Sequence, residues 1–456
     1  MFSEILKNQK VYFKTQETKS IAFRIAALQN LKAEIISKEQ AILNAIHMDF
    51  NKPAFETYIT EISVVLSEID LFIKNIKAWS KPKRVLPALL NFPSSEYIYK
   101  DPYGAVLIIS PWNYPFQLAI APLISAIACG NTVVLKPSEL TPNTSKLLAT
   151  IISKIFKPEH VLVLEGNAET ATNLLQLNWD YIFFTGSVNV GKTVAKAAAK
   201  HLTPVTLELG GKNPCIIDQT ADVKLSAKRI VWGKFLNAGQ TCIAPDYILI
   251  KASIKNEFYE ALKNEITIAY GSNPEKSTDY TRIVNKHNFE RLKSFLDNET
   301  IIYGGETNPE TNYISPTVLD ESKRSSKVMK EEIFGPILPV ISYSSFKDIE
   351  EIIYNYQKPL ALYIFSTNAK FQTKLLNNFS FGGGAINDTI IQFTNHRLPF
   401  GGVGYSGIGA YHGKNSFKTF THQKSIVKKA NWLDLPFRYA PYGNKIKTIK
   451  TLLKWL

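Results

Sequence analysis

A cysteine and a glutamate in two glycine-containing stretches are the strongest chemical signal in this sequence. Cys242 lies in Asn237-Ala-Gly-Gln-Thr-Cys-Ile-Ala, and Glu208 lies 34 residues upstream in Leu207-Glu-Leu-Gly-Gly-Lys. A cysteine thiolate is a nucleophile, and a nearby carboxylate can activate water as a general base. Together the two groups can form a thioester and then hydrolyse it. The pair therefore predicts covalent oxidation of an aldehyde.

The surroundings of the three cysteines set Cys242 apart from the other two. Gly239 removes side-chain bulk near Cys242, and we expect this to leave room for a substrate carbonyl. Cys129 follows an apolar stretch and Cys215 lies in Pro-Cys-Ile-Ile, so both are expected in the core. Three cysteines in a long chain form no disulfide framework. This usage is typical of a reduced, cytoplasmic protein.

Two further polar side chains are expected at the ends of strands. Glu208 lies between two leucines, where partial burial would raise the pKa of its carboxyl and suit it to general-base work near neutral pH. Asn113 occurs in Ser110-Pro-Trp-Asn-Tyr-Pro, directly after a strand-like run. Its amide can donate to an oxyanion, an interaction that contributes about 3 kcal/mol per donor. The alternative is that Asn113 only shapes the turn before Pro115.

Two other segments are candidates for binding a nucleotide. The segment from Thr185 to Gly191 follows a strand-like run and precedes a helical stretch, where backbone amides can bind pyrophosphate. It matches only part of the dinucleotide fingerprint. Lys136 and Glu139, after another strand-like run, would place a cation and a carboxylate near a ribose. A simple strand-to-loop turn would have the same sequence.

Composition and charge limit the class of protein. The chain has 456 residues, 45% hydrophobic and 20% charged, which predicts a globular protein of two or three domains. The longest apolar run, 118–129, is too short to span a membrane, and the N-terminus has no secretory pattern. The net charge of +14 is spread along the chain, so a solvated basic surface is favoured over nucleic-acid binding. The seven histidines lack metal-site spacing, so no metal is expected.

Periodicity predicts helices first and alternating strands and helices afterwards. Residues 18–48 are expected to be helical, with a break near Ile36, and a second helical pattern covers 57–79. Short apolar runs then alternate with helical segments, which predicts a mostly parallel sheet wrapped by helices. These runs are 104–110, 132–135, 161–164, 181–185 and 205–209. A second α/β series covers about 215–393, so the turn Glu208–Gly211 is expected near the junction, where ligands tend to bind.

The blocks around Glu208 and Cys242 resemble the two signature motifs of the aldehyde dehydrogenase superfamily. Four further motifs occur in that family's order: Ser110-Pro-Trp-Asn-Tyr-Pro-Phe, Lys136-Pro-Ser-Glu, Phe184-Thr-Gly-Ser and Glu331-Glu-Ile-Phe-Gly-Pro. The branch resembles class 3, which oxidises aromatic and medium- to long-chain aliphatic aldehydes. Four features indicate this branch: the short N-terminus, Asn387-Asp-Thr, Leu398-Pro-Phe-Gly-Gly-Val-Gly-Tyr-Ser-Gly and Phe437-Arg-Tyr-Ala-Pro-Tyr.

The resemblance implies a role for each matching residue. Cys242 would be the nucleophile, Glu208 the base, and Asn113 with the Cys242 backbone N–H the oxyanion hole. The implied cofactor contacts are Gly186, Ser187 and Gly191 for the pyrophosphate, Lys136 and Glu139 for the adenosine ribose, Glu332 and Phe334 for the nicotinamide ribose, and Trp112 and Leu209 for the cleft wall. NAD is expected, because Glu139 would repel a 2′-phosphate, and NADP stays open.

The resemblance also implies an α/β fold of two doubly wound domains and a small β arm. Residues 1–81 and 101–209 would form the cofactor-binding domain and 210–393 the catalytic domain. Residues 82–100 and 394–430 would form the bridging arm that makes a homodimer, followed by a tail, 431–456. Class 3 members with membrane anchors carry an apolar span after this tail, whereas this chain stops at Leu456, so a soluble form is expected.

Three alternatives remain open at this level. The first alternative is an acylating dehydrogenase that would pass the thioester to coenzyme A, although such enzymes often lack the glutamate. The second is a bare thioesterase, which would not need the nucleotide motifs. The third alternative is a non-catalytic protein that binds nucleic acid or a membrane. The segment 444–456 places Ile446, Ile449, Leu452, Leu453 and Leu456 on one helical face with lysines off it. It predicts either weak contact with an anionic membrane or, as we favour, a packed terminal helix near the substrate entrance.

Overall fold

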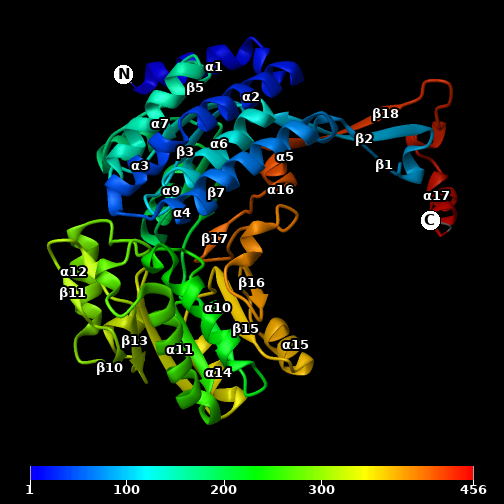
Figure 1. The fold of residues 1–456 in the computed structure, drawn as a ribbon. Coiled ribbons are helices and arrows are strands. Elements are labelled where there is room, and N and C mark those ends of the chain that lie inside the picture. Colours follow the sequence, from blue (N-terminus) through cyan, green and yellow to red (C-terminus); the bar gives the residue numbers. More distant parts are fainter. Residues whose placement is uncertain (1, 455–456) are drawn as a thin grey trace.

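Two helix-flanked sheets and a projecting β arm make up the computed structural model, which describes residues 2–454 (Figure 1). The helices at the N-terminus are α1 (Phe2–Lys14), α2 (Ile21–Ser37), α3 (Glu39–Phe50), α4 (Ala54–Thr57), a π-helical turn (Tyr58–Ile62) and α5 (Ser63–Ser80). The two helical segments and the break between α2 and α3 are confirmed. Their periodic apolar residues pack in one buried cluster against the first sheet.

The first sheet has six strands in the order β17-β7-β6-β3-β4-β5. Its parallel strands are β3 (Ala105–Ile109), β4 (Thr132–Lys136), β5 (Val161–Val163), β6 (Tyr181–Thr185) and β7 (Val205–Glu208), and β17 (Gly407–Ile408) is antiparallel to β7. The connecting helices are α6 (Gln117–Cys129), α7 (Pro142–Ile155), α8 (Ala168–Leu175) and α9 (Val188–Ala199). The five predicted strands are confirmed, because buried parallel strands are continuous apolar runs.

The second sheet has seven strands in the order β10-β13-β14-β9-β8-β15-β16. These are β8 (Pro214–Ile217), β9 (Tyr247–Lys251), β10 (Thr300–Tyr303), β13 (Thr317–Asp320), β14 (Ile337–Tyr343), β15 (Ala361–Phe365) and β16 (Gly383–Ile386); β11 (Thr307–Asn308) and β12 (Tyr313–Ile314) form a separate pair. The helices are α10 (Val223–Phe235), α11 (Lys255–Tyr270), α12 (Lys286–Lys293), α13 (Lys327–Lys330), α14 (Phe346–Ile353) and α15 (Ala369–Asn378). Only β10 is antiparallel to its neighbour, so the predicted mixed α/β fold is confirmed.

The arm consists of β1 (Lys83–Val85), β2 (Ser94–Pro102) and β18 (Thr421–Lys429), with β2 in the centre. It projects from the body of the molecule in Figure 1. The expectation that all of 394–430 belongs to the arm is wrong in part. β17 pairs with β7, and α16 (Lys414–Thr419) packs on α6, so this stretch covers the first sheet before β18 begins. The other domain limits stay predictions.

The C-terminal helix α17 (Lys445–Leu453) lies at the outer end of the arm in Figure 1. Within one chain it therefore does not lie at a substrate entrance, and Ile446 is 63% exposed. The side chains of Leu452 and Leu453 and the whole of Leu456 lie outside the described residues. None of the helices within residues 2–454 combines the length and apolar character needed to cross a membrane. Contact with an anionic membrane stays a prediction.

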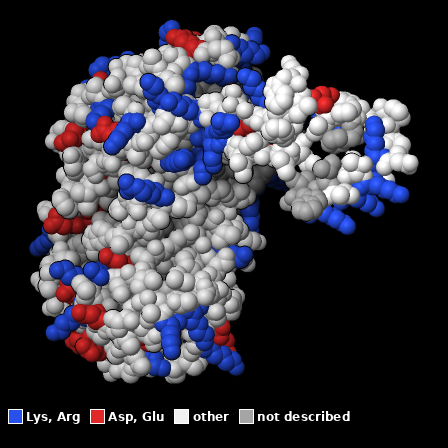
Figure 2. Space-filling view, turned by 90° about the vertical axis from the view of Figure 1, so that its right-hand side faces the viewer, with Lys and Arg blue, Asp and Glu red and all other residues white. Residues whose placement is uncertain are grey.

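The charged side chains follow the expected distribution on the visible face. Lysine and arginine side chains are dispersed over both the body and the arm in Figure 2, with acidic side chains among them on the body. This pattern agrees with a solvated basic surface, because a nucleic-acid footprint would gather the positive charge in one stripe.

Candidate active site

Two clefts meet at the predicted catalytic pair. The first cleft has a volume of about 290 Å³ and the second a volume of about 370 Å³. Both are lined by the same five residues at their junction: Leu118, Thr185, Glu208, Leu209 and Cys242. The nucleophile and the base therefore face the same two spaces, as a reaction between two bound molecules requires.

Glu208 ends β7 and is only 3% exposed. Within residues 2–454, neither of its carboxylate oxygens has a hydrogen-bond partner. Burial raises the pKa of this carboxyl well above its usual range, because the low-dielectric surroundings penalise the charged form. A buried carboxyl that is free of protein donors can bind water and take its proton, which is the chemistry of a general base.

The chain reaches Cys242 through an unusual turn. Asn237, Ala238 and Gly239 have φ values of 55°, 50° and 72°, all in the left-handed region. A Cβ at Gly239 would lie 2.3 Å from the Gly335 carbonyl oxygen. The prediction that Gly239 makes room for the substrate is therefore wrong. This glycine is needed because the turn has positive φ and because another backbone passes close to it.

The Cys242 thiol is half-buried among acidic groups. Burial raises its pKa to about 12, and the carboxylates of Glu332 and Glu208 add to the increase. The backbone N–H groups of Cys242 and Ile243 point at the sulfur and act in the opposite direction. The thiol is thus protonated at neutral pH in the cofactor-free protein. Cys129 and Cys215 are buried in the core, as predicted.

Asn113 connects the loop after β3 with the cysteine loop. The Asn113 Nδ2 donates to the Gln240 backbone carbonyl oxygen at 3.1 Å. The backbone carbonyl oxygen of Asn113 accepts from Asn237 Nδ2 at 2.9 Å. The side chain is 3% exposed and lines the second cleft together with Cys242. Because an amide nitrogen carries two hydrogens, one is left for an oxygen in the cleft.

Six of the nine predicted cofactor residues line the second cleft: Trp112, Gly186, Ser187, Leu209, Glu332 and Phe334. Gly186 and Ser187 precede α9, and Ser187 caps this helix by accepting from the Val190 N–H. The rings of Trp112 and Phe334 meet edge to face at 5.4 Å. A helix N-terminus and apolar walls suit the phosphates and the rings of a dinucleotide.

The other three predicted cofactor residues do not line this cleft. Lys136 and Glu139 form an ion pair of 2.5 Å with each other. Gly191 lies inside α9, where a Cβ would come within 2.6 Å of the Leu209 side chain. This glycine therefore lets the helix pack closely against the strand end, and its contact with the pyrophosphate stays a prediction.

Glu332 lines the second cleft and packs against the glycines that follow Glu208. Its carboxylate packs on Gly210, where a Cβ would lie 2.1 Å from Oε2, and it accepts from the Gly211 backbone N–H. Burial and the nearby Asp246 raise the pKa of Glu332 to about 8. Gly210 is thus required for the close approach of this carboxylate.

Several residues that line the clefts were not predicted from the sequence. Arg291 on α12 lines the second cleft and donates to the Ile333 carbonyl at 2.7 Å, which holds the segment carrying Glu332. The first cleft is walled by side chains from the π-helical turn and α5, from 114–118, from α10 and from the stretch after β16. Among them are Tyr114, Trp232, Ile390, Phe393 and Tyr411. No motif marks them, because each is a single residue from a distant segment.

Comparison with known proteins agrees with this geometry. The model of the aldehyde dehydrogenase family matches residues 2–426. The chain is 48% identical over 449 residues to 4,4′-diaponeurosporen-aldehyde dehydrogenase of Staphylococcus aureus, with 98% of both chains covered. It is 46% identical over 418 residues to aldehyde dehydrogenase family 3 member A2 of Pongo abelii, covering 92% of this chain and 86% of the relative.

A solved structure gives the same result at the level of the fold. The substrate-bound state of Staphylococcus aureus AldH superposes with a TM-score of 0.98 at 46% identity, and 99% of each chain is covered. The predicted fold class and the class 3 resemblance are confirmed. With a nucleophile and a base placed between two clefts, the chain belongs to the aldehyde dehydrogenase family, whose members oxidise aldehydes to carboxylic acids with NAD(P).

Proposed function

We propose that this enzyme oxidises apolar aldehydes, either aromatic or medium- to long-chain aliphatic, through a thioester on Cys242 that Glu208 helps to hydrolyse. The observation that carries the proposal is the position of Cys242 and Glu208 at the junction of two clefts of different character. One cleft has apolar walls, and the other has a helix N-terminus, a carboxylate and two aromatic rings.

The walls of the first cleft support the substrate class. Besides the catalytic pair they consist mainly of aliphatic and aromatic side chains, and charged groups other than Glu208 are absent among its lining residues. Burial of apolar surface contributes about 25 cal/mol per Å², so longer apolar chains gain affinity here. The Staphylococcus aureus relative is named for 4,4′-diaponeurosporen-aldehyde, and that aldehyde therefore belongs among the substrates to test.

The second cleft is proposed to hold the nicotinamide dinucleotide. This cofactor supplies the hydride acceptor when it is bound. Gly186 and Ser187 would hold its pyrophosphate at the start of α9, while Glu332 and Phe334 would hold the nicotinamide ribose. We propose that Lys136 and Glu139 meet the adenosine ribose beyond the cleft, where the Glu139 carboxylate would favour NAD over NADP.

The steps of the reaction follow from what these side chains can do. The Cys242 sulfur forms a bond to the aldehyde carbon, its proton leaves, and the carbonyl oxygen gains charge that Asn113 Nδ2 and the Cys242 N–H stabilise. Loss of hydride from that carbon leaves a thioester on Cys242. Glu208 then takes a proton from water, the water oxygen bonds to the acyl carbon, and the carbon–sulfur bond breaks to release the acid and the thiol.

Spectrophotometric turnover tests the function. Purified protein is assayed for reduced nicotinamide with NAD or NADP against hexanal, decanal and benzaldehyde. We expect turnover that is faster with decanal than with hexanal, and no turnover for Cys242→Ala. Cys129→Ala is the matched control, because that thiol is buried in the core and lines neither cleft.

Two results would overturn the proposal. A Cys242→Ala variant with normal turnover would remove the covalent step. Formation of acyl-coenzyme A in place of the free acid when coenzyme A is added would assign the enzyme to the acylating class.

A further inference from the structure

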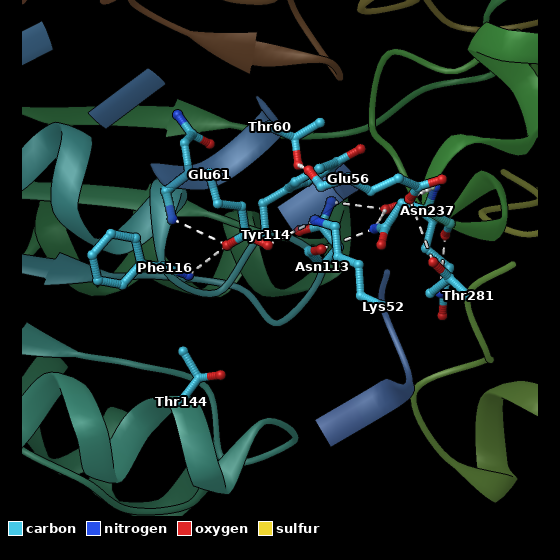
Figure 3. A network of polar contacts seen from close by, with 12 residues as sticks. Lys52, Glu56, Thr60, Glu61, Asn113, Tyr114, Phe116, Thr144, Asn237 and Thr281 are labelled. Carbon is cyan, nitrogen blue, oxygen red and sulfur yellow. Dashed lines mark hydrogen bonds and ion pairs between the residues drawn. The ribbon is translucent and has the colours of Figure 1, made fainter. Parts of the chain in front are cut away.

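A buried charged cluster outside both clefts touches the two loops that carry Asn113 and Cys242 (Figure 3). Its members are Lys52, which precedes α4, Glu56 on α4 and Glu61 in the π-helical turn. The side chains of Lys52 and Glu61 are fully buried, and they form an ion pair of 2.7 Å. A buried ion pair adds little to stability, because removing both charges from water costs about as much as their attraction returns. A role in positioning the two loops explains the presence of this buried ion pair better.

Glu61 holds the loop that follows Asn113. Its Oε1 accepts from Lys52, and its Oε2 accepts from the backbone N–H groups of Phe116 and Gln117 at 2.9 and 3.3 Å. These amides are at the start of α6, where the first N–H groups of a helix have no internal partner. Glu61 itself is in a π-helical turn, an irregularity that often occurs near functional sites.

Glu56 holds the cysteine loop from the same side. Its Oε2 accepts from the Asn237 backbone N–H at 3.0 Å and from Thr281 Oγ1 at 3.4 Å. Asn237 is the first residue of the left-handed turn that leads to Cys242. Two consecutive non-glycine residues with positive φ are costly unless the surroundings hold them. The Glu56 carboxylate supplies such a contact.

Lys52 and Tyr114 complete the connection between the loops. The Lys52 ammonium lies 4.1 Å from the centre of the Tyr114 ring, and the Tyr114 hydroxyl is 2.6 Å from Thr241 Oγ1, the residue before Cys242. Both loops are therefore attached to one rigid segment, 52–61, by buried contacts. Lys52, Glu56 and Glu61 themselves line neither cleft, whereas Ile59 and Thr60 of the same segment line the first one.

We propose that Lys52, Glu56 and Glu61 are positioning residues for the reaction. They fix the Asn113 loop and the Cys242 loop relative to each other, so that both oxyanion donors face the same substrate oxygen. The proposal rests on the proposed function of Asn113 and Cys242. Displacing a reacting group by about 1 Å can cost about 100-fold in rate, so a contact of this kind matters for turnover more than for cofactor binding.

The test compares three variants. Glu56→Leu removes the acceptor for Asn237, Glu56→Gln keeps a carbonyl oxygen at that place, and Glu34→Leu removes a carboxylate that pairs with Lys154 in the same helical layer without touching either loop. Steady-state kinetics, melting temperature and amide hydrogen exchange of peptide 236–242 are measured. We expect Glu56→Leu to lower kcat by about 10- to 100-fold with the KM for NAD within about twofold, and to speed exchange.

The two other variants decide whether the effect is positional. Glu56→Gln should recover kcat to within about threefold of the wild type, and Glu34→Leu should lower the melting temperature without changing kcat. Wild-type kcat or wild-type exchange in Glu56→Leu would overturn the proposal, as would an equal loss of kcat in Glu34→Leu. If Glu56→Leu does not fold, Glu61→Gln removes the charge that holds Lys52 and the Phe116 and Gln117 N–H groups without changing the lining of either cleft; unchanged kcat in this variant would overturn the proposal. The exchange readout needs no aldehyde, so it stays decisive even if the proposed activity fails.

Discussion

The charge around Cys242 decides when this enzyme can react. In the cofactor-free protein, burial and two nearby carboxylates keep the thiol protonated, with a pKa of about 12. Burial raises the pKa of the Glu208 carboxyl well above its usual range as well. A protonated Cys242 thiol limits side reactions of the sulfur, since the thiolate is the nucleophilic form.

This environment predicts a distinct pH dependence for alkylation of Cys242. In protein without cofactor, the rate of reaction with iodoacetamide should keep rising from neutral into strongly alkaline solution, because the thiolate fraction rises below a pKa of about 12. Glu332→Gln removes a negative charge that raises this pKa, and because Glu332 itself has a pKa of about 8, the variant should react faster than the wild type between about pH 8 and pH 12. Peptide mass spectrometry measures the alkylation, and a rate that levels off near neutral pH would contradict the account.

At the residue scale, motif recognition was effective for groups that act through their own chemistry. Cys242, Glu208 and Asn113 are predicted from motifs, and the structure places Cys242 and Glu208 at the junction of the clefts and Asn113 in the second cleft. Gly239 was misread, because its neighbour Gly335 is far away in sequence. The roles of Glu56 and Glu61 were missed for the same reason: a carboxylate that accepts from a distant backbone leaves no local pattern.

At the scale of elements, the turn before Cys242 has three consecutive residues with positive φ, which constrains what side chains it accepts. Gly239→Ala should destabilise the protein by about 1–3 kcal/mol and lower kcat, because the new Cβ would meet the Gly335 carbonyl at 2.3 Å. Gly443→Ala is the control, since φ there is also positive, at +45°, and a Cβ would meet nothing within 4 Å. Thermal unfolding and turnover of both variants measure the difference. Equal effects of the two substitutions would show that φ alone matters and that the contact with Gly335 does not.

Helices and strands followed from periodicity wherever a segment packs on one face or is buried on both. Periodicity did not predict where the C-terminal part of the arm begins. Residues 407–419 read as part of the arm, yet β17 completes the first sheet beside Glu208 and α16 covers α6. A two-residue strand has too little sequence to show a period, and its place is set by the partner strand that it meets.

At the scale of the whole molecule, the arm leaves one long strand edge open. β18 is the outer strand of its sheet over nine residues, and its Ile426 and Val427 are 41% and 51% exposed. A long exposed edge with apolar side chains invites pairing with another strand. Together with the family resemblance, this edge supports the predicted homodimer.

Sedimentation velocity tests the predicted dimer. The wild type should sediment as a dimer, and the double substitution Ile426→Lys and Val427→Lys should shift it toward the monomer, because two added charges would face each other across the paired edges. Lys424→Ala, on the same strand, is the control and should leave the dimer intact. A wild-type protein that sediments as a monomer would remove the dimer from the account.

The most direct test of the central claim is mass spectrometry of Glu208→Gln after incubation with decanal and NAD. Without the base, the account predicts that one equivalent of reduced nicotinamide forms and that the decanoyl group stays on the peptide containing Cys242. The wild type, treated in the same way, should show turnover and no such adduct. Full turnover by Glu208→Gln, or a decanoyl group on any other residue, would contradict the assignment of Cys242 and Glu208 as nucleophile and base.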